Sequence, residues 1–331
     1  MPNFFGYEKQ WQFLKKSVEL AKLSHAYLFS GKSQLGKRET AKEFSRLINC
    51  QSDNFKDRPC GKCQSCQETQ KNCHPDFLWL DTKKEAGDSE IESIRNLSQW
   101  LHLRAGLGEY KVAIINQFQN FSLPAQSALL KTLEEPKGKT VLILICDYPE
   151  FLSPTIVSRV QEIRFQSLPN EKIIEFLIAR GAKEPLAKKI SYLSMGKPMK
   201  ASELLDGRQM KLEEEKINDF RELLKENLAF SFREIEKIVE EKEDIFQRLE
   251  IWLNFLRIIF LERIGVITDR MSDIPSCAIK EEIVGQEKSI SLVDLVNLKN
   301  LLSSLEKANY LLLKTNANKR LVLENSILEL F

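Results

Sequence analysis

The sequence predicts an α/β domain built on a parallel β-sheet, followed by an all-helical region. Five short apolar runs alternate with helical patterns over the first half of the chain. This alternation is typical of parallel sheets, which bind ligands at the carboxyl ends of their strands. After Leu168 and Pro169 the remaining apolar stripes all have helical spacing. The strands are expected at residues 26–29, 77–80, 112–115, 141–146 and 162–165.

The helices are predicted from apolar residues that recur every three or four positions. In the first half they are expected at residues 11–21, 41–48, 91–101 and 126–133, the last with Ser122 as a cap ahead of Pro124. In the second half they are expected at residues 173–178, 186–193, 199–205, 220–228, 245–260, 292–313 and 321–330, with a loop-rich connection at 267–289. Such stripes most simply form the core of a helical bundle rather than a cofactor site.

Composition indicates a globular protein without a strong charge bias. Charged residues make up 29% of the 331 residues and the formal net charge is +2, so charge alone predicts neither nucleic-acid nor membrane binding. The longest purely apolar run, from Val141 to Cys146, is too short to span a bilayer. The N-terminus lacks the apolar core and cleavage site of a secretory signal. We therefore expect a cytoplasmic protein with no membrane partner.

A glycine-rich loop lies between the first predicted strand and the next helix, which is the context of a phosphate-binding loop. Gly31, Gly36 and Lys37 match G-x-x-x-x-G-K-[ST], but Arg38 replaces the final hydroxyl residue that would contact magnesium. Lys37 and the loop N–H groups retain the chemistry to hold a phosphate. A loop inherited from an ATP-binding ancestor and now empty would give the same pattern. ATP binding is therefore left open, and hydrolysis by this loop is not expected.

A second departure follows the strand expected at residues 112–115. Asn116 and Gln117 stand where a P-loop hydrolase carries Asp and Glu, the acids that hold magnesium and activate the attacking water. An amide oxygen is a poorer magnesium ligand than a carboxylate and cannot act as a general base near neutral pH. The stretch from Lys111 to Pro136 thus has the form of a hydrolase site without its acids.

Four of the seven cysteines form a C-x9-C-x2-C-x2-C pattern at Cys50, Cys60, Cys63 and Cys66. Each short C-x2-C step lets one tight turn present two thiolates to a tetrahedral zinc ion, and a reducing compartment favours metal over disulfides. We predict a closed, structural zinc site with no catalytic role. Cys73 and His74 lie close in sequence and are the alternative ligands.

Together these motifs resemble the clamp-loader subunits of bacterial DNA polymerase III. The resemblance is carried by HAYLFSG at residues 25–31, the four-cysteine insertion, HPDF from His74, ALLKTLEEP at residues 128–136, and the Ser158–Arg159 pair before a strand. It implies an AAA+ P-loop domain with a zinc-binding insertion, a small helical lid and a C-terminal helical collar. The expected boundaries are 1–166, with the zinc module at 50–66, then 167–208 and 209–331.

Within the family, the departures are similar to the delta-prime members rather than to the ATP-hydrolysing gamma and tau members. The resemblance places Asp147 where a motor subunit has a sensor Thr and Met199 where it has a sensor Arg. It implies that Arg159 is an arginine finger acting in trans on the ATP site of a neighbouring motor subunit. The implied partners are gamma or tau and delta subunits in a hetero-pentamer, the sliding clamp, and primer–template DNA through the complex.

Two alternatives are left open. An active ATPase would use Asp147 or Glu134 as its acid, and turnover abolished by Lys37→Ala would identify it. A zinc-containing DNA-binding module would show steeply salt-dependent binding. Such a module would use the basic residues beside the cysteines, although a charge run of this kind is usually a solvated face: Lys56, Arg58, Lys62 and Lys71.

Overall fold

The computed structural model describes residues 6–81, 90–225, 228–240, 245–265, 295–315 and 317–328. The chain divides into two compact units. The first comprises Met1–Lys172 and Lys197–Lys200, and the second comprises Ile173–Gly196 and Ala201–Phe331. The finer division at 166 and 208 stays a prediction. The loop-rich connection expected at 267–289 lies outside the described residues.

The first unit is built around a five-stranded sheet whose described strands all pair in parallel, in the order β2-β3-β4-β1-β5. The strands are β1 (Ala26–Ser30), β2 (Phe77–Leu80), β3 (Lys111–Ile115), β4 (Thr140–Cys146) and β5 (Gln161–Arg164). All five sequence predictions are therefore confirmed to within one residue at each end. Continuous apolar runs identify them because both faces of such a sheet are covered.

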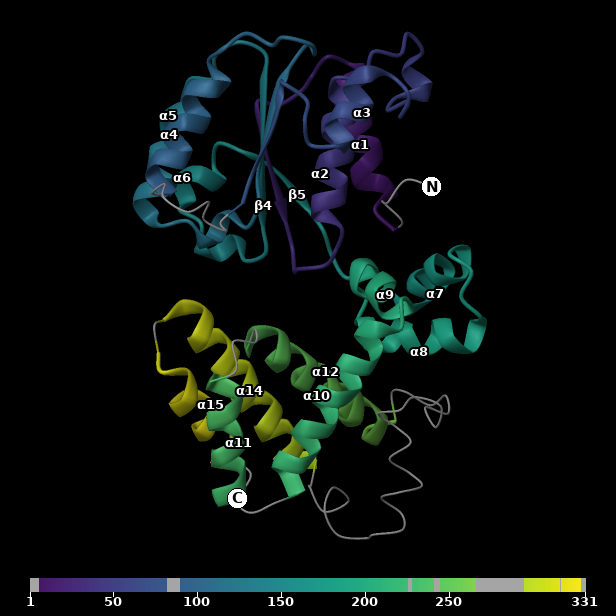
Figure 1. The fold of residues 1–331 in the computed structure, drawn as a ribbon, viewed down its shortest axis with the longest axis vertical. Coiled ribbons are helices and arrows are strands. Elements are labelled where there is room, and N and C mark those ends of the chain that lie inside the picture. Colours follow the sequence, from purple (N-terminus) through teal and green to yellow (C-terminus); the bar gives the residue numbers. More distant parts are fainter. Residues whose placement is uncertain are drawn as a thin grey trace. The chain divides into compact units, whose positions relative to one another are not determined.

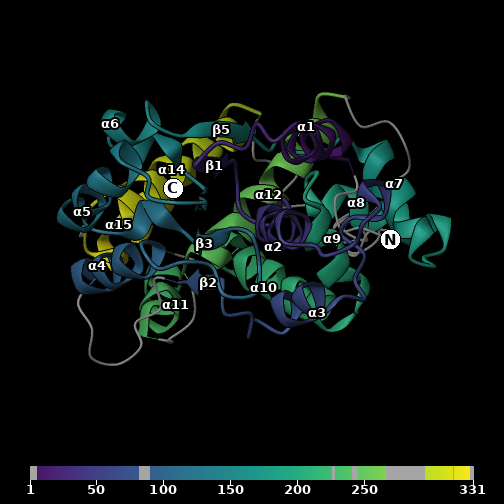
Figure 2. The ribbon, with the colours of Figure 1, turned by 90° about the horizontal axis from the view of Figure 1, so that it is seen from above.

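The helices of the first unit cover the two faces of the sheet (Figures 1 and 2). Tyr27 and Phe29 of β1 pack on the face covered by α1 (Glu8–Glu19) and α2 (Lys37–Ile48), and α3 (Gln64–Gln70) lies on the same side. Ala26 and Leu28 pack on the opposite face. That face is covered by α4 (Glu90–Leu101), α5 (Leu123–Glu134) and α6 (Pro154–Val157).

Three local features differ from the sequence predictions. Helix α2 begins at Lys37, earlier than expected, because Gly36 adopts a left-handed conformation (φ 87°) at its N-cap. Helices α3 and α6 were not predicted, because α3 has seven residues without an apolar stripe and α6 has only four residues. Ser122 does occupy the N-cap of α5, but its hydroxyl makes no capping bond. Instead, its backbone N–H donates to Glu90 Oε2 at 3.0 Å.

The regular elements described in the second unit are all helices. They are α7 (Asn170–Ala179) and α9 (Pro198–Leu205), whose first residues belong to the first unit, and α8 (Glu184–Ser194), α10 (Arg208–Lys225), α11 (Leu228–Glu240), α12 (Ile245–Arg263), α14 (Leu295–Lys314) and α15 (Lys319–Leu328). The core contains Phe220 stacked on Trp252, with ring centroids 4.7 Å apart. The helix expected at 220–228 corresponds to the end of α10 and the first residue of α11, and the remainder of α11 was not predicted. None of the described helices is long and apolar enough to cross a membrane.

Candidate functional site

The predicted phosphate-binding loop has the backbone geometry that its sequence requires. Gly31 follows β1 with φ 133°, and a Cβ at this position would lie 2.1 Å from the carbonyl oxygen of Phe165. Gly36 has φ 87° and is the N-cap of α2. Only glycine satisfies both the conformation and the close approach at residue 31. The glycine loop therefore lies directly between β1 and the N-terminus of α2, which is the arrangement a phosphate-binding loop requires.

The side chain of Lys37 is bonded within its own cleft. It is 4% exposed, and its ammonium donates to Asp147 Oδ1 at 2.6 Å, to the Lys32 carbonyl at 2.6 Å and to the Gly31 carbonyl. An ammonium has three N–H donors, so these three acceptors use all of them. Burial lowers the pKa of Lys37, and the carboxylate of Asp147 opposes that shift. The Lys37 ammonium, which would bind a phosphate, is thus already paired with the Asp147 carboxylate of the same chain.

The two amides predicted to replace hydrolytic acids lie at the same edge of the sheet. Strand β4 pairs with both β3 and β1, so the carboxyl ends of these strands bring Asn116, Asp147 and Gly31 together. Asn116 is 2% exposed. Gln117 has a left-handed backbone (φ 50°), and its side-chain oxygen accepts from Asn120 at 3.5 Å. Neither amide supplies the negative charge that would hold a magnesium ion.

Asp81 is a cleft residue that the sequence analysis missed. Its Oδ2 accepts from Asn116 Nδ2 at 3.2 Å and lies 3.7 Å from Arg38 Nη2. The guanidinium of Arg38 also lies 5.2 Å from the centre of the Trp79 ring. The sequence does contain a signal for this residue, because Asp81 directly follows the strand predicted at residues 77–80. Arg38 therefore pairs with an acid at the place where the motif would present a hydroxyl.

Arg159 lies outside this cleft, between α6 and β5. Its Nη2 is 2.8 Å from Glu134 Oε1 at the end of α5, and its Nη1 donates to the Thr155 carbonyl at 2.9 Å and to Ser158 Oγ at 3.1 Å. The side chain is 36% exposed. The guanidinium itself is therefore held by three acceptors of this chain while the side chain remains exposed to solvent in part.

Strand register places Arg159 at the opposite end of the sheet from the loop. Strand β5 starts at Gln161, which pairs with Tyr27, four residues before Gly31. A strand rises about 3.3 Å per residue, so about 13 Å separates this level from the glycine loop. Arg159 precedes the strand and lies beyond that level. The cleft residues and Arg159 consequently do not come together within one chain.

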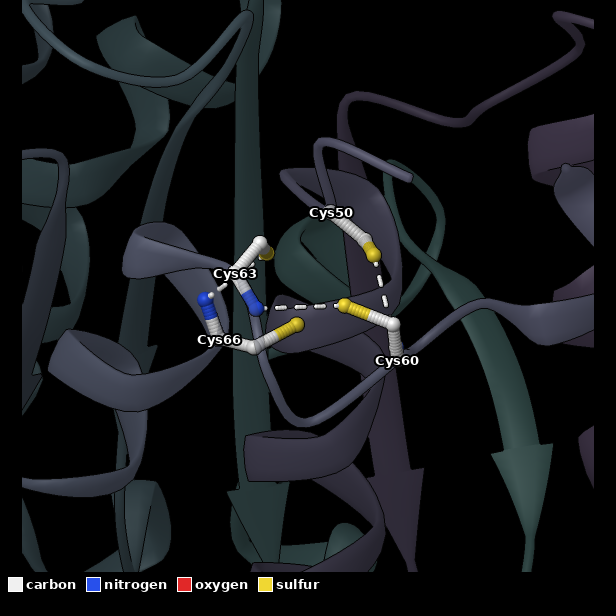
Figure 3. A group of neighbouring side chains, drawn as sticks. All are labelled: Cys50, Cys60, Cys63 and Cys66. Carbon is white, nitrogen blue, oxygen red and sulfur yellow. Dashed lines mark hydrogen bonds between the residues drawn. The ribbon is translucent and has the colours of Figure 1, made fainter. Parts of the chain in front are cut away.

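The four predicted metal ligands do come together. Cys50, Cys60, Cys63 and Cys66 bring their sulfur atoms within 4.8 Å of one another (Figure 3). Backbone N–H groups of residues 60, 63 and 66 donate to the sulfurs of Cys50, Cys60 and Cys63 at 3.4, 3.3 and 3.4 Å. Four convergent thiols suit a tetrahedral zinc ion. The cluster could hold zinc.

The thiols of this cluster differ in acidity. Backbone N–H groups of Cys63 and Lys62 lower the pKa of Cys60, which favours its thiolate form. Burial raises the pKa of Cys50 and of Cys66. Metal ligation requires thiolates. Binding at this cluster would therefore release protons from the two buried residues.

The alternative ligands lie outside the cluster. Cys73 is exposed. His74 is buried, with its Nε2 3.0 Å from Ser65 Oγ, and its Nδ1 accepts from the Asp76 N–H at 3.0 Å. Both ring nitrogens are therefore used in the protein. His74 joins α3 of the cysteine module to the start of β2.

Asp76 is a second residue whose role the sequence did not reveal. Its carboxylate is 1% exposed and accepts from the N–H groups of Gly106, Leu107 and Gly108 at 2.8, 2.8 and 2.7 Å. Lys111 Nζ lies 3.7 Å away. Asp76 thus fixes the loop that precedes β3, the strand carrying Asn116 at its end.

Of the basic residues named beside the cysteines, Lys56, Lys62 and Lys71 are exposed, whereas Arg58 is half-buried and bonded within the module. Arg58 Nε donates to the Ser52 carbonyl at 2.7 Å, and its guanidinium lies 5.9 Å from the centre of the Phe55 ring. The Lys15 ammonium lies 5.7 Å from the same ring. Arg58 therefore stabilises the loop of the module.

Comparison with known proteins identifies the family. Residues 6–169 match the family model described as DNA polymerase III, delta subunit. Residues 6–169 therefore belong to the DNA polymerase III delta-subunit family. This membership confirms the resemblance inferred from the sequence motifs, and the parallel sheet, cysteine insertion and helical second unit confirm the predicted fold class.

Relatives of this DNA polymerase III family include both delta-prime and tau subunits. The chain is 31% identical over 218 residues to DNA polymerase III subunit delta' of Pseudomonas aeruginosa, covering 64% of this chain and 65% of that protein. It is 31% identical over 184 residues to the Bacillus subtilis subunit delta', covering 55% and 54%. It is 34% identical over 169 residues to the Bacillus subtilis subunit tau, covering 51% and 29%. These matches span less than two thirds of each relative.

Solved structures of similar proteins are more distant. A DNA polymerase III gamma subunit-related protein of Thermotoga maritima is 19% identical with a TM-score of 0.43, covering 97% of this chain and 98% of that one. The Bacillus subtilis DNA clamp loader delta protein is 15% identical with a TM-score of 0.37, covering 97% and 99%. Similarity at this level does not bear on function.

Proposed function

We propose that this chain is a delta-prime-type subunit of the DNA polymerase III clamp loader that hydrolyses no ATP itself. It supplies Arg159 in trans to the ATP site of a neighbouring gamma or tau subunit. The observation that carries the proposal is the separation of the two half-sites. Lys37 is bonded to Asp147 at one end of the strands, and Arg159 is presented at the other end.

Arginine suits the proposed role. Its planar guanidinium pairs with two phosphate oxygens at once and stays charged at every relevant pH. An arginine supplied in trans accelerates phosphoryl transfer by roughly 10³- to 10⁵-fold. The chain would therefore control ATP hydrolysis by a neighbouring subunit while its own cleft hydrolyses no ATP.

The assembly follows from the same proposal. The helical second unit would form the collar of a hetero-pentamer with motor and delta subunits. The complex would load a sliding clamp onto primed DNA in the cytoplasm, with a structural zinc ion in the cysteine cluster of this chain. These partners come from the family, whose relatives are DNA polymerase III subunits.

The competing enzyme hypothesis has little support from the geometry. Of its two proposed acids, Asp147 accepts from Lys37, and Glu134 lies with Arg159 away from the cleft. Neither is placed beside the glycine loop as an unpaired carboxylate. The DNA-binding hypothesis depends on basic residues of which Arg58 already bonds within the module.

The test is the ATPase of the reconstituted complex with motor and delta subunits, clamp and primed DNA. Arg159→Ala should leave assembly intact and lower turnover at the ATP site that it serves by roughly 10³-fold or more. Arg164→Ala is the matched control, because Arg164 is an exposed arginine at the other end of β5, paired with Glu162. Equal turnover for wild type and Arg159→Ala would contradict the proposal.

A further inference from the structure

We infer that Asp147 is an autoinhibitory residue: its carboxylate takes the place of a phosphate at Lys37 and closes the loop to nucleoside triphosphates. The inference shares with the proposed function only the premise of a silent cleft. It attributes the absence of nucleotide binding to one side chain rather than to loss of the phosphate-binding geometry of the loop.

The loop itself retains the parts that hold a phosphate. Gly31 and Gly36 keep the required backbone, and α2, with 12 residues, begins at Lys37. The N-terminus of such a helix favours negative charge. What prevents binding is therefore not the shape of the loop.

The charge at Lys37 is fully compensated from within. The Lys37 and Asp147 side chains are 4% and 14% exposed, and 2.6 Å separates the ammonium from the carboxylate. A triphosphate approaching this ammonium meets a carboxylate that already satisfies it. Removing only the negative charge would leave a buried cation with neutral oxygen partners alone, and a buried charge without a counter-ion is strongly unfavourable. An anionic ligand would then be favoured.

Neighbouring groups hold this arrangement in place. The Asp147 backbone N–H donates to Gln119 Oε1 at 3.1 Å, which fixes the residue directly after β4. Lys197 is a second cation near Lys37 and adds positive charge at the site. Cys146, the remaining titratable group acting on Lys37, is buried, and burial raises the pKa of its thiol to about 12. It is therefore neutral near pH 7.

A second internal contact joins the loop to residues 197–200 of the same unit. The Met199 backbone N–H donates to the Gln34 carbonyl at 3.2 Å. The family resemblance expects a nucleotide-sensing arginine at residue 199, whereas this chain has Met199 there and bonds it to the loop through its backbone N–H. This contact is a second internal restraint on the loop.

The experiment is calorimetric titration of the full chain with ATP, with and without magnesium. Wild type should show no Lys37-dependent binding. The Asp147→Asn variant, which keeps the shape of the side chain and removes its charge, should bind ATP at least tenfold more tightly than wild type. Asp147→Asn combined with Lys37→Met should lose that gain, and Asp53→Asn, at an exposed acid of the same unit, should behave as wild type.

Three outcomes would overturn the inference. One is wild-type binding as tight as that of Asp147→Asn. Another is a gain that persists in the double variant. The third is no gain in Asp147→Asn or Asp147→Thr when either keeps the wild-type unfolding temperature. If both variants unfold, wild type compared with Lys37→Met decides, because the inference requires equal, negligible binding. Arg159→Ala does not enter this assay, so its result stands apart from the test of the proposed function.

Discussion

The guanidinium of Arg159 lies 2.8 Å from the carboxylate of Glu134, at the C-terminal end of α5. A cation is also favoured near a helix C-terminus. With the Thr155 carbonyl and Ser158 Oγ, three acceptors on two helical segments hold this side chain. These contacts within one chain therefore fix the orientation of Arg159.

Glu134→Gln should separate the effect of orienting the Arg159 side chain from the effect of its charge on ATP hydrolysis. The pair is half-exposed, so its loss should change the free energy of unfolding by less than about 1 kcal/mol in urea titrations. Turnover at the neighbouring ATP site should fall by less than about tenfold, or about 1.4 kcal/mol, because the Nη1 bonds remain. A loss as large as that of Arg159→Ala would show that Glu134 is indispensable for positioning.

Zinc binding is testable by elemental analysis. Purified protein should contain one zinc ion per chain, and Cys63→Ser should lose it, because a structural site needs all four thiolates. Cys73→Ser is the control, since Cys73 is exposed and outside the cluster. Metal-free wild type, or metal loss in both variants, would refute the assignment.

Asp76→Asn should weaken the fold in a pH-dependent way. Burial acts to raise the pKa of Asp76, but the N–H groups of residues 106–108 and the charge of Lys111 outweigh it and lower the pKa. A lowered pKa means that the carboxylate stabilises the fold above its unfolded value of about 3.9. That stabilisation is lost as the pH falls through the folded-state value.

The substitution should therefore cost about 1–3 kcal/mol near pH 7, because the amide leaves buried N–H groups unsatisfied. The difference from wild type should shrink below about pH 4. Chemical unfolding at several pH values measures both effects. Asp53→Asn, at an exposed position, should show no comparable loss. A pH-independent difference would contradict the role given to the carboxylate.

Gly31→Ala tests the backbone of the loop. A methyl group there would lie 2.1 Å from the Phe165 carbonyl oxygen. Gly138 also has positive φ but has nothing within 4 Å of a Cβ, so Gly138→Ala reports the conformational cost alone, about 1 kcal/mol. Thermal unfolding should show a clearly larger loss for Gly31→Ala. Equal losses would mean that the loop relaxes away from β5.

Features determined by adjacent residues were predicted well from the sequence. Buried parallel strands appear as continuous apolar runs, which located all five strands. The two C-x2-C steps dictate their own turns, which located the cysteine cluster. Helix α3 was missed because it is short and polar.

Pairings between distant residues were not predictable. Lys37 and Asp147 are 110 residues apart in sequence and meet because β4 pairs beside β1. Asp81 joins Asn116 and Arg38 for a related reason, since β2 pairs with β3. The sequence identified where hydrolytic residues were missing, but only the strand order shows which side chains occupy their surroundings.

Parallel strands also give the chain a direction. If Arg159 serves a neighbour from the amino ends of the strands while ATP clefts open at the carboxyl ends, each contact is head-to-tail. Repeated contacts of this kind close into rings or continue without limit unless one member cannot extend them. A chain that offers Arg159 but fills its own cleft with Asp147 has nothing for a further finger to act on. Such a chain can only be the last subunit of a head-to-tail assembly, and it would limit the number of subunits.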